Sequence, residues 1–270
     1  MTAWYPWLAL GLGLFVGSFL NVLIYRLPIM LMRSAADDAA QSGLPDVNLC
    51  WPPSHCPGCR HAVMPWDNIP LLSWLLLRGR CRYCQCAIPV IYPLSEVLTG
   101  AVFCALIYCY FPHFTLVQIL FLACFYCLIY ALAIIDSNTL LLPDCLVFPL
   151  MWLGLAASVL HIIPVSPRDS VMGAIFIGCC TWLIAQGHRW ICKREGLGGG
   201  DVKLYAACAA WIGLDHIAEL MLGSAALGIV AFIIRGLLRF RRVTAAEPYM
   251  PFGPAIAVAA LLILHMEVLR

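Results

Sequence analysis

Charged residues are scarce in this sequence: of its 270 residues, 11% are Asp, Glu, Lys or Arg, whereas 63% are apolar. A soluble domain carries about 25% charged residues, so this scarcity excludes a soluble globular protein. Positions 1–6 hold no Lys or Arg, and no small-residue cleavage site follows the first apolar run; we therefore expect no cleavable signal peptide. The net charge of +2 gives no indication of nucleic acid binding. Lipid is the expected solvent for most of the surface.

The apolar residues gather into eight segments, most of which approach the roughly 20 residues that a membrane-spanning helix needs. They are 7–25, 94–111, 115–135, 145–163, 170–191, 202–213, 216–234 and 251–267. The sixth is short and fits a partial or tilted span. The sequence therefore predicts an all-α polytopic membrane protein with about eight transmembrane helices and a small cytoplasmic zinc-binding module, for which the cysteines below are the evidence.

Basic residues indicate the orientation of these segments. Of the 16 Lys and Arg residues, 14 lie within 26–95, 189–203 and 235–242. With eight spans and the N-terminus outside, all 14 fall on the cytoplasmic side, as the positive-inside rule requires. Both chain termini are then expected outside the cytoplasm.

Three parts follow from this topology: a first transmembrane helix at 1–25, a cytoplasmic loop at 26–93 and a multi-helix membrane domain at 94–270. Within the loop, the apolar run 69–77 is too short to cross a bilayer. We expect it to pack either against the rest of the loop or against the membrane surface.

Two CxxC pairs lie in the cytoplasmic loop. Cys56 and Cys59 form the first, and after 21 intervening residues Cys81 and Cys84 form the second. Pairs at this separation are typical of a tetrahedral four-thiolate zinc site, and a structural zinc stabilises a module too small to build a core. Disulfides are the alternative, although cytoplasmic thiols stay reduced. Three neighbours are close enough to replace a ligand: Cys86, His55 and His61.

Two aspartates stand at the cytoplasmic ends of predicted spans. Asp136 follows directly after an apolar run, at the C-terminal end of the predicted helix, where its negative charge opposes the helix dipole. This position is unfavourable for stability and therefore indicates a functional role. Asp201 follows the glycine-rich run 196–200, which read alone could be a hinge with Asp201 capping the next helix. Asp144, beside Pro143, fits a helix-capping carboxylate.

The predicted topology places Asp136 and Asp201 at the same depth on the same face of the membrane. Two carboxylates that share a site tend to hold one proton between them, which is the arrangement an aspartic protease needs. The alternatives are an ion- or proton-coupled transporter with acidic residues at its helix ends, and a zinc-stabilised scaffold without chemistry.

The motifs together resemble the type IV prepilin peptidases, which are bifunctional leader peptidases and N-methyltransferases. The resemblance runs nearly end to end and includes the paired CxxC motifs and the GxGxGD pattern that ends at Asp201. The other matching stretches are 17–28, 67–74, 79–82, 92–96, 135–136, 142–144 and 251–254.

This resemblance implies that Asp136 and Asp201 are the catalytic pair and that the protein resides in the bacterial inner membrane. It implies that the substrates are type IV prepilins and type II secretion pseudopilins, cleaved after a glycine. The new N-terminus would be methylated with S-adenosylmethionine. The residues of methyl transfer stay unassigned, since no cofactor loop is recognisable.

Overall fold

The computed structural model describes residues 4–35, 46–111, 113–193, 196–239 and 250–269. Three of the basic residues that set the expected topology lie outside these ranges, namely Arg194, Arg241 and Arg242. The described chain is α-helical, with two isolated β-bridges, His55–Ala62 and Arg80–Ala87. The expected all-α class is therefore confirmed for the described residues. The chain divides into two compact units, Met1–Ala123 and Cys124–Arg270.

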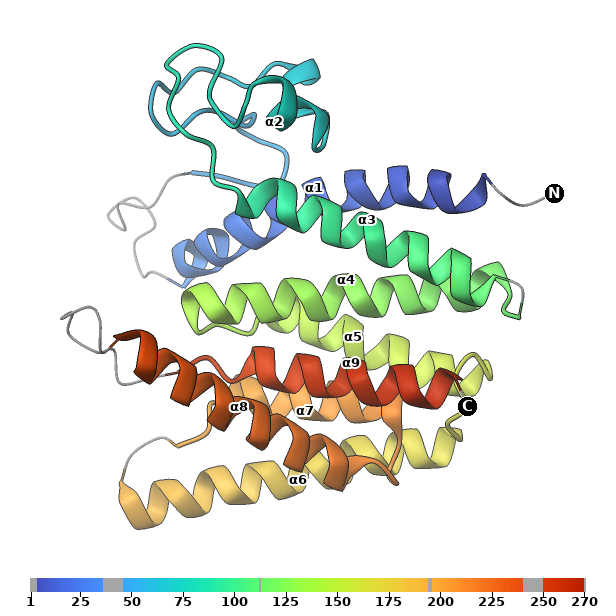
Figure 1. Ribbon diagram of the computed structural model, residues 1–270. Helices are drawn as coiled ribbons and strands as arrows, with labels where there is room; N and C mark the ends of the chain where they lie inside the picture. The colour runs from blue at the N-terminus through green and yellow to red at the C-terminus, as the bar shows by residue number, and fades with distance from the viewer. Residues whose placement is uncertain (1–3, 36–45, 112, 194–195, 240–249, 270) are drawn as a thin grey trace. The chain divides into compact units, whose positions relative to one another are not determined.

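Unit 1 is built on two long helices, α1 (Tyr5–Ser34) and α3 (Ile91–Tyr110), which pack against each other (Figure 1). A Cβ atom on Gly13 would lie 2.7 Å from the Cα of Gly100, and one on Gly17 would lie 2.8 Å from the Cα of Glu96. The backbones thus approach directly, as they do where small residues form helix contacts in membranes. Helix α1 continues nine residues beyond the expected end at 25.

Between these helices lies the cysteine module, residues 50–88, which contains the short 3-10 helix η1 (Pro65–Asn68) and α2 (Leu72–Leu76). The buried Arg26 links α1 to the segment that leads into the module. Its guanidinium donates to the carbonyl oxygens of Asn48 and Pro52 at 2.8 and 2.7 Å.

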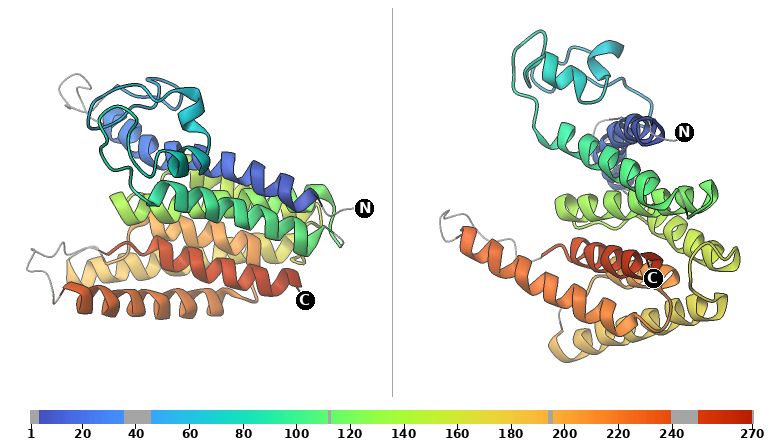
Figure 2. Two further views of the ribbon diagram at one scale, coloured as in Figure 1. Left: turned by 45° about the horizontal axis from the view of Figure 1, so that its top comes forward. Right: turned by 45° about the vertical axis from the view of Figure 1, so that its right-hand side comes forward.

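Unit 2 holds most of α4 (Leu116–Thr139), which crosses the division, and five further helices. These are α5 (Asp144–Val159), α6 (Pro167–Cys192), α7 (Gly199–Ile212), α8 (Ile217–Arg239) and α9 (Gly253–Leu269). Helix α7 is the centre of the unit, since it packs against α5, α6 and α9 (Figure 2). All of its residues from Ala207 to Ile212 are buried. The fully buried Trp211 donates its indole N–H to the carbonyl oxygen of Leu150 at 2.8 Å.

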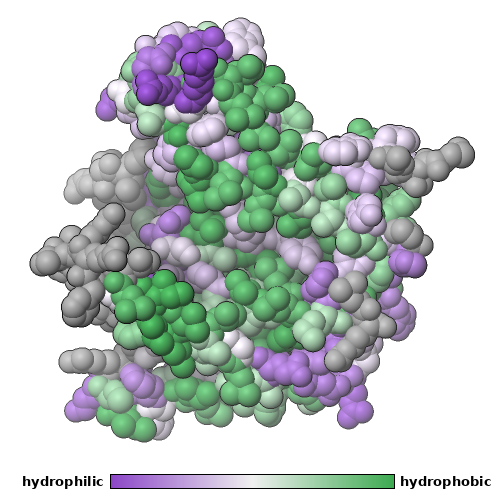
Figure 3. All heavy atoms as spheres, in the orientation of Figure 1, coloured by the Kyte–Doolittle hydropathy of each residue, from purple (hydrophilic) through white to green (hydrophobic). Residues whose placement is uncertain are grey.

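Apolar side chains also cover the outside of the protein. On α1, Leu8, Leu12, Phe15 and Phe19 are each more than half exposed and recur at helical spacing. Figure 3 shows extensive hydrophobic surface along the helices of the described chain. Among the described residues, five helices are long and apolar enough to cross a membrane: Tyr5–Ser34, Ile91–Tyr110, Leu116–Thr139, Pro167–Cys192 and Ile217–Leu237. These features fit a polytopic membrane protein.

Candidate active site and metal centre

Asp136 lies in the last turn of α4 and is buried, with 4% of its surface exposed. Its carboxylate oxygen Oδ2 accepts the backbone N–H of Gly253, the first residue of α9, at 2.8 Å. The contact leaves no room for a side chain, because a Cβ on Gly253 would lie 2.7 Å from Oδ2. Glycine at 253 therefore lets a helix N-terminus meet this carboxylate directly.

Asp201 is the third residue of α7, and its carboxylate accepts the backbone N–H of Gly198, the N-cap residue. An acidic side chain that reaches back to the N-cap in this way stabilises the start of a helix. The side chain is partly buried. The helix-capping role considered for Asp201 from sequence therefore corresponds to an actual contact. A second group also acts on its carboxylate.

That partner is Asp136, which is near enough for its charge to act on the Asp201 carboxyl. The end of α4 and the starts of α7 and α9 lie at the same end of unit 2 (Figures 1 and 2). The N-termini of α7 and α9 thus offset the repulsion between the two carboxylates, since the positive end of a helix dipole stabilises an anion. The unfavourable position of Asp136 at the end of its own helix is compensated by the start of another.

The glycine run before Asp201 has distinct roles at successive positions. Gly200 packs on Leu142, from which a Cβ would be only 2.9 Å away, whereas a Cβ on Gly199 would meet nothing within 4 Å. The run therefore brings α7 against the 140–143 loop, and only part of it requires glycine for space.

One turn after Asp201, Tyr205 is buried and its hydroxyl lies 2.5 Å from the hydroxyl of Ser224 in α8. Its ring also neighbours that of Phe252, with centroids 6.3 Å apart. This contact links the start of α7 to the residue before Gly253 and so connects the surroundings of the two carboxylates.

Asp144 has a partner other than the one its sequence position predicts. It is the first residue of α5, the N-cap Pro143 makes no side-chain cap bond, and both carboxylate oxygens of Asp144 lie 2.8 Å from Nζ of Lys203. About half of each side chain is exposed, and exposed ion pairs contribute little stability. The capping expectation is replaced by an exposed ion pair with Lys203.

The two CxxC segments fold into matching turns. In the first, Cys56 N–H donates to the carbonyl of His61 and Arg60 N–H to that of Cys56; in the second, Cys81 N–H donates to Cys86 and Gln85 N–H to Cys81. The residue after each second cysteine has positive φ, 57° at Arg60 and 60° at Gln85. By this correspondence Cys56 matches Cys81, Cys59 matches Cys84, and His61 matches Cys86.

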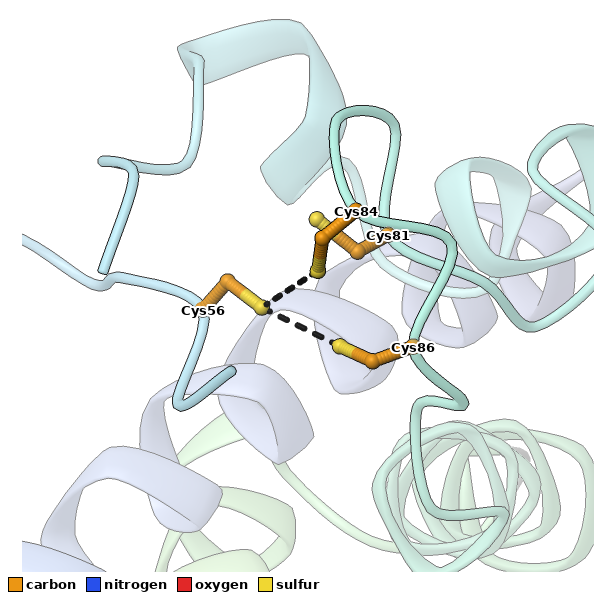
Figure 4. Close-up of side chains that lie close together, drawn as sticks. All are labelled: Cys56, Cys81, Cys84 and Cys86. Atoms are coloured by element: carbon orange, nitrogen blue, oxygen red, sulfur yellow. Dashed lines mark hydrogen bonds between the residues drawn. The ribbon is translucent and has the colours of Figure 1, made fainter. Parts of the chain in front are cut away.

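Five sulfur atoms gather where these turns meet. Those of Cys56, Cys81, Cys84 and Cys86 all lie within 4.8 Å of one another (Figure 4). The expected ligand Cys59 is not in this group, in which Cys86 takes its place, and its sulfur lies 4.0 Å from that of Cys81. All 15 cysteines are free thiols.

The distances fit a tetrahedral zinc ion. Four sulfurs about 2.3 Å from zinc are about 3.8 Å from each other. The Cys56–Cys84 and Cys59–Cys81 separations are 3.6 and 4.0 Å, close to this edge, whereas Cys56–Cys86 is shorter at 3.2 Å. The pKa of Cys56 is lowered to about 6, chiefly by the backbone N–H of Cys59 and then by the Cys86 thiol. The turn therefore favours the thiolate that a metal needs at Cys56, whereas the pKa of Cys59 in the same turn is raised to about 11, in part by burial and by the neighbouring thiols.

Sequence patterns did not indicate that Gly253 donates to Asp136 or that Tyr205 bridges to Ser224. The only signal for the first was the matching stretch 251–254, which gave no role. Sequence also did not predict the partner of Glu96, a buried residue of α3. Its carboxylate accepts the backbone N–H of Leu71 at 2.8 Å.

Two family profiles match the chain. The profile described as Bacterial Peptidase A24 N-terminal domain covers residues 12–110, and that of the Type IV leader peptidase family covers residues 122–233. The boundary between them coincides closely with the division of the structure after Ala123. Each unit therefore corresponds largely to one of the two family profiles.

Full-length relatives agree with these profiles. A protein of Pectobacterium carotovorum subsp. carotovorum named prepilin leader peptidase/N-methyltransferase is 44% identical over 257 residues, 93% of this chain and 89% of the relative. Proteins of the same name from Dickeya chrysanthemi and Neisseria gonorrhoeae are 41% and 36% identical, covering 96% and 95% of this chain and 91% and 88% of those proteins. No solved structure matches the chain significantly. On the evidence of its sequence relatives and both profiles, this chain belongs to the type IV leader peptidase family.

Proposed function

We propose that this enzyme is an intramembrane aspartyl endopeptidase whose catalytic pair is Asp136 and Asp201. The observation that carries the proposal is the proximity of these two carboxyls, one in the last turn of α4 and one in the first turn of α7, at which the charge of Asp136 acts on Asp201. Gly253 supports the pair by fixing the Asp136 carboxylate through its backbone N–H. Family membership supplies the reaction class.

The two carboxyls divide the acid and base work of peptide hydrolysis. The ionised member removes a proton from water, whose oxygen attacks the scissile carbonyl carbon, while the protonated member donates to the carbonyl oxygen. A proton then passes to the amide nitrogen as the C–N bond breaks, and an amine and a carboxylic acid leave. One proton shared between the carboxyls suffices to start each cycle.

The substrates we propose are type IV prepilins and type II secretion pseudopilins, cleaved after the glycine that ends their leader. The names of the relatives support this assignment. A substrate whose own apolar helix lies in the bilayer presents its leader at the cytoplasmic interface, the depth at which the proposed topology puts both aspartates. The same enzyme then methylates the new terminal amine, with S-adenosylmethionine supplying the methyl group.

For the topology we propose eight spans in the bacterial inner membrane, with both termini periplasmic and the active site and cysteine module cytoplasmic. Helices α5 and α7, with 16 and 14 residues, are about 24 and 21 Å long and act with α9 as short spans. We retain 1–25, 26–93 and 94–270 as functional parts, the last containing the peptidase chemistry.

The metal we propose is a structural Zn²⁺ held by Cys56, Cys59, Cys81 and Cys84. The Cys56–Cys84 and Cys59–Cys81 separations are two opposite edges of the required tetrahedron. Four thiolates leave no position for a reacting water, so the ion stabilises the module and takes no part in peptide cleavage.

Cys86 takes a supporting role in this assignment. Its sulfur is 3.2 Å from that of Cys56, closer than two ligands of one tetrahedral zinc lie, and it occupies the position that His61 has in the first turn. A protonated Cys86 donates a hydrogen bond to the Cys56 thiolate, in the way that outer groups orient metal ligands.

The experiment that tests the function is cleavage of a purified prepilin by the purified full-length enzyme, with and without S-adenosylmethionine, followed by mass spectrometry. We expect one product cut after the leader glycine without the cofactor, and that product plus one methyl group with it. Proton or ion flux through enzyme-containing liposomes without any prepilin cleavage would contradict the proposal and favour a transporter.

A further inference from the structure

The segment from Trp66 to Leu76 in the cysteine module exposes large apolar side chains, although its helix α2 has only five residues. Leu76 is 83% exposed and Trp66 60%, and three further members are at least 40% exposed. We name this set the apolar edge; its members are Trp66, Ile69, Leu72, Leu75 and Leu76. Contiguous apolar exposure of this kind marks an interaction site.

The position of the apolar edge along the membrane normal follows from a hydrogen bond within unit 1. The backbone N–H of Leu71, directly before α2, donates to Oε2 of Glu96 at 2.8 Å. Glu96 lies five residues into α3 (Ile91–Tyr110), one of the helices able to span a membrane. At 1.5 Å per residue this is roughly 7 Å inward from the start of α3.

That depth corresponds to the boundary between headgroups and acyl chains, where interfacial helices bury their apolar faces by about 5–10 Å. Figures 1 and 2 agree in showing the module beside the N-terminal part of α3. The beginning of α2 is therefore held beside a membrane-spanning helix and not above it in the cytoplasm.

The polarity around α2 matches an interfacial location. Arg78 and Arg80 follow the helix within four residues and are exposed, so they are available to anionic headgroups, to which each basic residue near the surface contributes about 1 kcal/mol. In Figure 3 the module has a strongly hydrophilic portion next to a hydrophobic one. Apolar and basic residues thus adjoin, as in interfacial membrane segments.

From these observations we propose that the apolar edge inserts into the cytoplasmic interface of the bilayer, so that the cysteine module is a membrane-docked domain. The partner is the lipid itself: acyl chains contact the leucines, and the headgroups of anionic phospholipids contact the arginines. This docking is independent of peptidase and methyl-transfer chemistry.

The test uses the full-length enzyme with the photo-crosslinking amino acid p-benzoylphenylalanine at Leu76. The protein is placed in liposomes of phosphatidylethanolamine and phosphatidylglycerol, irradiated, and weighed by mass spectrometry. Leu98, an exposed residue of α3, is the lipid-facing control, and Tyr83 of the second CxxC turn is the aqueous control. We expect lipid adducts at Leu76 at a yield similar to Leu98 and roughly tenfold above Tyr83.

A cross-link from Leu76 to another part of the same chain or to a second copy, in place of lipid, would overturn the proposal, as would a yield no higher than at Tyr83. A second measurement places the crosslinker at Leu72 and compares the parent with the Leu75→Glu, Leu76→Glu variant. We expect the adduct at Leu72 to fall by roughly fivefold or more while the zinc content stays unchanged. An unchanged adduct in a variant that keeps its zinc would also overturn it.

Discussion

The cysteine module and the aspartate site each bring together residues far apart in the sequence, but they are held by different forces. The module has short turns, few buried apolar side chains and cysteines of which Cys59 and Cys84 are exposed. The aspartate site rests on α7, whose residues Ala207 to Ile212 are all buried. The zinc proposed above would therefore be the main stabilising element of the first, whereas the second rests on packed helices.

The largest expected difference between the two regions concerns the metal. Structural zinc contributes about 10–16 kcal/mol in small zinc-binding peptides, so Cys59→Ser and Cys81→Ser should each leave the purified enzyme with less than about half an equivalent of zinc. In hydrogen exchange, residues 50–88 should lose protection while α7 keeps it. Loss of protection in both regions would show that their stabilities do not have separate origins. Cys50→Ser, outside the cluster, is the matched control.

The next effect concerns the proposed catalytic pair. Asp136→Asn and Asp201→Asn should each lower the rate of prepilin cleavage by at least about 10³-fold, because an amide cannot exchange the proton that general acid–base catalysis needs. Folding should survive, since the Asn oxygen still accepts the N–H of Gly253 or Gly198. Initial rates of prepilin cleavage are compared with those of the control variant Asp144→Asn, which changes only an exposed ion pair. Comparable losses in all three variants would count against Asp136 and Asp201 as the catalytic pair.

A smaller loss is expected from Gly253→Ala. The added Cβ would lie 2.7 Å from Oδ2 of Asp136, so the carboxylate must move, and a displacement near 1 Å costs about 10²-fold in rate. The fall should appear in kcat with little change in KM. Gly199→Ala, where a Cβ meets nothing within 4 Å, should stay within about twofold of the parent; equal rates for both variants would remove the positioning role of Gly253.

Within the module, Cys86→Ser should be milder than Cys59→Ser. A hydrogen-bond donor to a metal ligand typically changes affinity by about 10- to 100-fold, so Cys86→Ser should keep one equivalent of zinc and release it more readily to a chelator. Competition with a coloured zinc chelator measures this affinity. The reverse order, with Cys86→Ser empty and Cys59→Ser loaded, would assign the fourth ligand position to Cys86.

The smallest effect is expected from the ion pair of Asp67 with Arg82, whose Nε and Asp67 Oδ2 are 2.8 Å apart. Hydrogen bonding to Arg82 lowers the pKa of Asp67. The pair therefore stabilises the module above the ordinary aspartate pKa, and the contribution is lost as pH falls through the lowered value. Asp67→Asn should speed zinc release at neutral pH by about two- to fivefold. The same increase on introducing Asp67→Asn into an Arg82→Gln variant, which lacks the ion pair, would contradict this origin.

Part of this arrangement could be predicted from local sequence. The apolar segments led directly to the helices, because a stretch of chain in lipid must satisfy its own backbone hydrogen bonds. The spacing of Cys56, Cys59, Cys81 and Cys84 pointed to one cluster, since each CxxC turn needs only its own residues to form. Asp136 and Asp201 were selected by their positions at span ends.

Other features required the folded chain. Nothing near Asp144 in sequence indicates Lys203 as its partner, and the capping interpretation failed because the side chain had a cation available from another helix. Asp136 and Gly253 are 117 residues apart, and their bond depends on how α4 and α9 pack. Cys86 was recognised from sequence as a neighbour that could replace a ligand, whereas its 3.2 Å distance from the Cys56 sulfur, on which its proposed supporting role rests, came from the folded chain.

The sequence by itself determined the solvent, the helical class and the chemical types available for a site, because composition, periodicity and short spacings are local properties of a chain. Tertiary structure alone decided which backbone N–H fixes Asp136, which side chain neutralises Asp144, and at what depth α2 lies beside α3. Each of these depends on a contact between segments distant in sequence, and such contacts are selected by the packing of whole helices.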